Sequence, residues 1–326
     1  MQRWIAALDR FQQRHRPTAV AFAVSKKFGD DQGGHLCALM TYYAFVSIFP
    51  LLLVLVTVLG YVLQDRPALR ADILDSALAE FPVLGDQLRN NLTSVRGNGI
   101  ALVIGVLVTF YGGLGVAGAA QAAMNRVWEV PVRDHPGFFP RLARSIALIG
   151  TFGAGVIVTT LVSGAGGEIV RRFGPGFGFA AVVVLGLALN LVLFVAAFRF
   201  LTTASPSTRD VLPGALVAAV GWEALQLLGG AYVTRVLHGM SQTYGVFALV
   251  LGLLAWLFLL VRVVVYAAEL NAVLVMRLWP RSIAPPLTDA DQRAYAAYAR
   301  TRLYRPDAEV PVAEVPVPDA PVDGSG

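Results

Sequence analysis

Residues 244–276 read YGVFALVLGLLAWLFLLVRVVVYAAELNAVLVM, and the architecture of the chain can be inferred from this segment. It is apolar almost throughout, whereas a helix of about 20 such residues already crosses the hydrocarbon core of a bilayer. Arg262, Tyr266 and Glu269 interrupt it at helical spacing and therefore share one helix face. Ionisable groups in lipid cost at least about 2.5 kcal/mol each, so we expect this face to point into protein or into a wet cavity. The stretch predicts a membrane span with a polar face.

The composition extends this interpretation to most of the chain. Of its 326 residues 56% are hydrophobic and 14% are charged, whereas about 25% are charged in a typical soluble domain. We therefore predict an all-α polytopic membrane protein with six transmembrane helices. The predicted spans cover residues 36–63, 99–123, 145–163, 179–201, 211–230 and 244–276.

The N-terminal segment, residues 1–35, carries apolar residues at helical spacing among arginines and lysines. Trp4, Leu8 and Phe11 fall on one face, which predicts a short amphipathic helix. Two placements stay open: the helix lies on the membrane surface, or it packs against the protein's own cytoplasmic face.

Two further polar segments flank the predicted spans. Residues 64–97 are predicted to form a helical extracytoplasmic loop, with Pro82 between two short helices. Residues 279–326 are predicted to form a cytoplasmic tail, disordered from about residue 306 because it is rich in proline and acidic residues. Most of the 26 Lys and Arg residues fall on the side of the two termini, which predicts that both termini are cytoplasmic.

The sequence contains no recognisable set of catalytic or metal-binding residues. Cys37 is the one cysteine, which excludes a disulfide framework or a cysteine-based zinc site. The four histidines have no metal-ligand spacing, and the nearest carboxylate pair, Asp30 and Asp31, is expected to be solvated. We therefore predict no enzymatic activity, no metal and no cofactor. The net charge of +5 is explained by basic helix flanks and predicts no nucleic-acid partner.

Polar or small side chains gather on single faces of several spans, and such faces turn away from lipid. They predict a polar cavity inside the bundle, next to a helix kink at the proline of the first span. The alternative is that these side chains only join helices to one another. The candidate residues are Tyr43, Ser47, Pro50, Tyr111, Asn125, Asn190, Glu223, Gln226, Arg262, Tyr266, Glu269 and Asn271.

The acidic members of this set allow two roles. Glu223 and Glu269 would carry protons if burial keeps them neutral near pH 7. The preferred interpretation is instead that one of them is paired permanently with Arg262.

Four segments resemble the YihY/BrkB family of bacterial inner-membrane proteins, and the resemblance covers about residues 20–278. They are ALMTYYAFVSIFPLLL (38–53), AAMNRVWEV (122–130), RFLTTASPSTRDVLPGALVAAVGWEALQ (199–226) and the opening stretch above. The resemblance implies an inner-membrane protein with about six helices. Some members are linked to lipid or lipopolysaccharide export, and an older ribonuclease label is regarded as mistaken.

These observations together predict a transporter that moves a lipid or another amphipathic envelope component through the polar cavity. The lipid part comes from the resemblance, since the residues predict only a polar interior. The alternative function is a membrane scaffold that assembles envelope-building proteins. The expected partners are membrane lipids, with a second copy of the chain and envelope-assembly proteins also considered.

Overall fold

The computed structural model describes residues 2–62, 99–151, 155, 174–232 and 238–301. The secondary structure of these residues is helical and contains no strand, which confirms the all-α class for this part of the chain. The helices are α1 (Gln2–Arg14), α2 (Arg16–Asp30), α3 (Gly33–Val62), α6 (Gly99–Val127), α8 (Pro175–Phe200), α9 (Thr208–Tyr232), α10 (His238–Val275) and α11 (Asp289–Thr301). Residues 138–151 are also helical, and Val132–Asp134 form a short 3-10 turn.

Two of the described helices are long and apolar enough to cross a membrane. The qualifying stretches are Val183–Phe200 in α8 and Val250–Val275 in α10. The total of six spans stays a prediction. The predicted loop at 64–97, much of the third predicted span and the tail from residue 302 lie outside the described residues.

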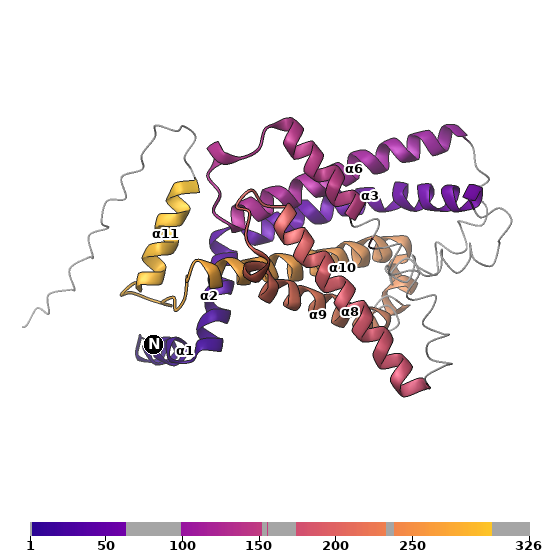
Figure 1. The fold of residues 1–326 in the computed structure, drawn as a ribbon. Helices are drawn as coiled ribbons and strands as arrows, with labels where there is room; N and C mark the ends of the chain where they lie inside the picture. The colour runs from indigo at the N-terminus through magenta and orange to yellow at the C-terminus, as the bar shows by residue number, and fades with distance from the viewer. Residues whose placement is uncertain (1, 63–98, 152–154, 156–173, 233–237, 302–326) are drawn as a thin grey trace, which may run out of the picture.

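The helices form an elongated bundle with a cap at one end (Figure 1). Helices α3 and α6 pack side by side along most of their length, and α10 packs against α9 and α3. Helix α8 packs on α9. At one end of the bundle lie α1, α2, α11 and the segment 276–288, which we name the terminal cap. Part of the predicted tail is thus folded, since Asp289–Thr301 form α11, and the part predicted to be disordered, from about residue 306, lies outside the described residues.

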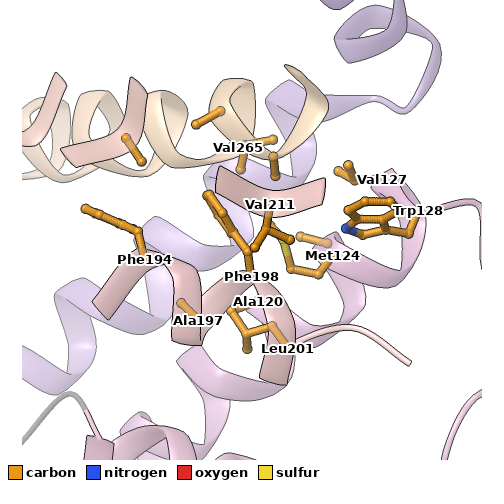
Figure 2. Packing of buried hydrophobic residues seen from close by; sticks show 14 of the residues in the cluster. Ala120, Met124, Val127, Trp128, Phe194, Ala197, Phe198, Leu201, Val211 and Val265 are labelled. Atoms are coloured by element: carbon orange, nitrogen blue, oxygen red, sulfur yellow. The ribbon is translucent and has the colours of Figure 1, made fainter. Parts of the chain in front are cut away.

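A compact apolar core lies where the ends of four helices meet (Figure 2). Met124 and Trp128 at the end of α6 meet Phe198 of α8, Val211 of α9 and Val265 of α10. Alanines fill most of the remaining buried positions, which lets the helix backbones approach closely.

The outer surface of the bundle carries many exposed large apolar side chains. Leu107 of α6, Val184 and Val192 of α8, and Phe247 of α10 are each more than half exposed. Soluble proteins rarely expose apolar patches so extensively, whereas lipid-facing helices do so along their length.

Helix α1 turns its apolar side away from the described protein. Trp4 is 78% exposed, and Leu8 and Phe11 are also exposed. The opposite side of the helix binds the cap: Gln12 Nε2 donates to the Arg281 carbonyl at 2.6 Å, and the Ile283 amide donates to an Asp9 carboxylate oxygen. Helix α1 therefore contacts the cap through its polar side, and its position at a membrane surface stays a prediction.

Candidate functional site

Four charged side chains on one turn of α2 organise the junction between cap and bundle. Lys27 and Asp31 point inward and are buried, while Lys26 and Asp30 point toward the segment after α10. The two lysines are adjacent, and each lies four residues before its acidic counterpart, so the helix presents two parallel pairs on neighbouring faces. Each pair recruits further charges from distant parts of the chain.

The inner pair forms a buried charge cluster around Lys27, whose side chain is 2% exposed. The Lys27 ammonium donates to Asp31 Oδ2 at 2.5 Å and to Glu129 Oε1 at 3.0 Å. It also lies 3.5 Å from Glu269 Oε2, whose residue is fully buried in α10. Arg126 at the end of α6 approaches Asp31 at 3.8 Å. This Lys27 cluster therefore joins α2, the end of α6 and α10.

The surroundings shift the pKa values of two members of the Lys27 cluster, Lys27 and Glu129, which lie outside the span-length helices. Burial alone would lower the pKa of Lys27, but the carboxylates of Glu269, Asp31 and Glu129 together raise it above its ordinary value. Burial raises the pKa of Glu129, and the nearby Lys27 only partly offsets this effect. The lysine is thus firmly charged, while the carboxylates compete for it.

The outer pair forms a second network that holds the terminal cap together. The Asp291 carboxylate accepts hydrogen bonds from Lys26, from Arg281 Nε and from the Ser282 amide, at 2.8 to 2.9 Å. Arg281 also donates to Asp30 at 2.6 Å. Burial alone would raise the pKa of Asp291, but these donors together lower it well below its ordinary value.

Two expectations from the sequence are corrected here. Glu269 forms its ion pair with Lys27 of α2, not with Arg262. This partner could not be predicted from the sequence because Lys27 lies outside the predicted spans. It was interpreted only as one of the basic residues that flank the first span. The pair Asp30 and Asp31 is not simply solvated, because Asp31 is buried and both carboxylates are held in ion pairs.

Most of the other predicted cavity residues are engaged in local contacts. Glu223 accepts a hydrogen bond from Asn190 of α8 at 2.8 Å. Asn271 accepts the Gly214 amide at 2.6 Å and thereby joins α10 to α9. Asn125 accepts the Thr203 amide at 2.8 Å.

The remaining predicted residues lie on several different faces. Ser47 donates to the Tyr43 carbonyl within α3, and Tyr111 is 71% exposed. Gln226 is half-buried on α9, and the backbone at Pro50 is helical within α3. The structure brings Tyr266, Arg262 and Glu269 toward α2, and it brings Glu223 and Asn190 together between α8 and α9.

An apolar groove of about 570 Å³, partly open at the surface, lies between α3 and α10. We name it the lateral groove, and Arg262 is the one charged residue among those that line it. Its lining consists of Ala38, Thr41, Tyr42, Leu254, Ala255, Trp256, Phe258, Leu259 and Arg262. The Thr41 hydroxyl is already used, because it donates to the Cys37 carbonyl.

Arg262 is held by aromatic rings. Its guanidinium carbon lies 5.7 Å from the centre of the Phe28 ring and 5.6 Å from that of Tyr266. These two rings stack on each other at 4.2 Å between centroids. Within the described residues Arg262 has no acidic partner, and its side chain is exposed to the groove. Sequence reasoning placed this charge on the same face as Tyr266 but did not find Phe28, which comes from α2.

The described residues form a helical bundle with many exposed apolar side chains and two helices of span length, which are features of a helical membrane protein. The family model described as virulence factor BrkB matches residues 24–287, most of the chain, so the protein belongs to the BrkB family. The described residues contain no group of three or more His, Cys, Asp and Glu side chains able to hold a metal ion.

Curated relatives carry names that agree with this class. The inner membrane protein YhjD of Escherichia coli (strain K12) is 27% identical over 78% of this chain and 81% of that protein. A UPF0761 membrane protein of Pseudomonas aeruginosa (strain LESB58) is 28% identical over 84% of this chain and 68% of that protein. YfkH of Bacillus subtilis (strain 168), whose name calls it ribonuclease-like, is 24% identical over 76% of this chain and 91% of that protein. No solved structure matches the chain.

Proposed function

We propose that the protein binds an anionic membrane lipid in the lateral groove and moves it across the bacterial inner membrane. The observation that carries the proposal is the combination of an apolar, partly open groove between α3 and α10 with a single cation among its lining residues, Arg262. The proposal includes six spans, cytoplasmic termini and no catalytic step.

The charge of Arg262 indicates the kind of headgroup. It lies within the span-length stretch Val250–Val275, where an uncompensated charge is costly. Stacking on Phe28 and Tyr266 contributes about 0.5–2 kcal/mol, less than the cost of removing a guanidinium from water. The N–H donors of a planar guanidinium fit a phosphate group with two parallel hydrogen bonds. A phosphate would therefore supply the missing countercharge.

The rest of the groove fits the apolar part of such a lipid. Its volume of about 570 Å³ falls in the range of about 300–1,000 Å³ typical of small-molecule sites. Side chains such as Leu254, Phe258 and Leu259 offer apolar contact to an acyl chain. Because Arg262 rests on Phe28 of the terminal cap, we place the phosphate near the cap and expect the lipid to enter from the cytoplasmic leaflet.

The test compares lipid binding and lipid movement by the full chain in phosphatidylglycerol and phosphatidylcholine bilayers. Arg262→Gln should weaken phosphatidylglycerol binding by at least about tenfold, since a charge-assisted hydrogen bond contributes about 1.5–3 kcal/mol. Arg262→Lys should recover part of the binding. The matched control is Arg199→Gln, because Arg199 is an exposed arginine at the end of α8 outside the groove. Equal binding and equal lipid movement by wild type and Arg262→Gln would refute the proposal.

A second candidate is the membrane scaffold, and the exposed apolar face of α1 is the observation that favours it. In this function the face formed by Trp4, Leu8 and Phe11 would contact another envelope protein or a second copy of the chain. Replacing all three with serine should then abolish complex formation in membranes while lipid binding at the groove is retained. A loss of membrane-surface contact without a change in partners would instead assign the face to lipid.

A further inference from the structure

We infer that the Lys27 cluster is a proton-binding site, which holds one proton among the carboxyl groups of Asp31, Glu129 and Glu269. The bound proton keeps the terminal cap attached to α6 and α10. This inference rests on the geometry of the cluster alone and stands whether or not the protein moves lipids.

The first observation is an excess of acid in a buried place. Three carboxylates, those of Asp31, Glu129 and Glu269, surround the ammonium of Lys27. The only other cation paired with them in the described part of the chain is Arg126, which lies 3.8 Å from Asp31 and is partly exposed. Ionisation of all three carboxyl groups would therefore leave one buried negative charge without a counterion.

The second observation is that four of the six carboxyl oxygens lack a hydrogen-bond donor among the described residues, while Arg126 Nε, itself without a hydrogen-bond partner there, lies 3.8 Å from Asp31 Oδ1 and is too far away to donate. Asp31 Oδ1, Glu129 Oε2 and both carboxyl oxygens of Glu269 are buried and have no donor. An ammonium has three N–H groups, and Lys27 directs two of them to Asp31 and Glu129. The third faces Glu269 at 3.5 Å, which is longer than an ordinary charge-assisted hydrogen bond. A carboxyl proton would add the donor that these oxygens lack.

Charged groups from three helices and one turn face the cluster. Helix α2 contributes Lys27 and Asp31, α6 contributes Arg126, the turn after α6 contributes Glu129, and α10 contributes Glu269. Among the described neighbours, the buried thiol of Cys37 in α3 interacts electrostatically with Arg262 and Glu269. From α11, Tyr298 accepts a hydrogen bond from Arg126 and so holds that guanidinium away from a close pair with Asp31.

The ligand is a proton rather than a metal ion. Lys27 already occupies the position among the three carboxylates where a cation would bind, and no described group of side chains fits a metal. The step is a simple association: a carboxylate takes a proton from water to become a carboxylic acid, whose O–H donates to a neighbouring carboxylate oxygen. Removing the proton would set Glu269 of α10 against Asp31 of α2, because like charges in a buried site repel strongly.

The experiment is infrared titration of the purified full chain in lipid nanodiscs. Carboxylic acids and carboxylates absorb at separate frequencies, so a buried protonated carboxyl group is visible directly. Wild type should retain a carboxylic-acid band at neutral pH, where ordinary Asp and Glu groups have lost their protons. The band should disappear at alkaline pH, and hydrogen exchange in α2 should rise over the same pH range.

Variants assign the band. Glu269→Gln should remove it, because a neutral amide replaces the protonated acid, and Glu129→Gln should remove or shift it. The matched control is Glu223→Gln, which alters a half-buried glutamate that accepts a hydrogen bond from Asn190 outside the cluster. The inference is overturned if wild type has no such band at neutral pH, or if only Glu223→Gln removes it. Since the first criterion needs no variant, a poorly folding substitution does not weaken the test.

Discussion

Replacing Lys27 with methionine tests how strongly the Lys27 cluster stabilises the protein. Methionine keeps much of the volume, so the loss of charge dominates over any cavity. The substitution removes hydrogen bonds at 2.5 and 3.0 Å and leaves the three carboxyl groups facing one another in a buried site without the cation that they share. Breaking a buried ion pair on one side costs about 3–5 kcal/mol, and we expect a loss of that size at pH 7.

The loss should depend on pH in a direction that the structure fixes. Without Lys27, the carboxyl groups relieve their repulsion by taking up protons. Protonating an ordinary glutamate costs about 3.7 kcal/mol at pH 7 but only about 1 kcal/mol at pH 5. The destabilisation by Lys27→Met should therefore shrink as the pH falls, and it should also shrink when Glu269→Gln is added at pH 7. Residues in one ionic network typically couple by about 0.5–3 kcal/mol.

The assay is the apparent free energy of unfolding, measured by detergent titration in mixed micelles at several pH values. The matched control is Lys26→Met, which removes the neighbouring lysine on the same helix. The partner of Lys26, Asp291, keeps donors from Arg281 and Ser282 and is not left unsatisfied, so we expect a loss of about 1 kcal/mol. The reasoning is refuted if Lys27→Met costs no more than Lys26→Met, or if its cost is the same at pH 5 and pH 7.

Three further predictions concern helix packing and the network charges. Gly214→Ala should cost about 1–3 kcal/mol in the same assay because its methyl group would collide with the Ala267 carbonyl, whereas Gly176→Ala, with open space around it, should be neutral or slightly stabilising. Asp291→Asn should release α11, measured as faster proteolysis of the terminal cap. The lowered pKa of Asp291 means that release in wild type should begin only as the pH falls below about 4, the ordinary range of aspartate, and should increase as the pH falls further toward the lowered pKa. The raised pKa of Glu129 means that the folded state holds a proton that the unfolded state has lost, so wild-type stability should fall as the pH rises from about 4.3; this slope should be smaller in Glu129→Gln.

The helices could be predicted from the sequence because their signal is local. Long apolar runs identified α3, α6, α8, α9 and α10 to within a few residues at most ends. The folded segment after α10 was missed for a different reason. Asp291 of α11 binds Lys26 and Arg281, and no periodic pattern in the sequence indicates that these charges meet.

The polar contacts of the bundle show the same limit. Periodicity correctly placed Arg262, Tyr266 and Glu269 on one side of α10, since that depends only on the helical repeat. It could not identify what packs against that side. The answer, Lys27 and Phe28, lies more than 200 residues earlier in the chain, in a helix that the sequence places outside the membrane.

The adjacency of Lys27 and Phe28 ties the two candidate sites to each other. Lys27 holds Glu269 in the cluster, while Phe28 stacks on Tyr266 and supports the guanidinium of Arg262 in the groove. A shift of α2 away from α10 would break both contacts together, because consecutive residues of a helix move as one rigid segment. The charge state of the cluster and the position of the groove arginine are therefore properties of one joint between α2 and α10. If an anion binds at Arg262 as proposed and a proton binds at the cluster as inferred, both would favour the arrangement in which α2 packs on α10. By thermodynamic reciprocity, each would then strengthen the binding of the other.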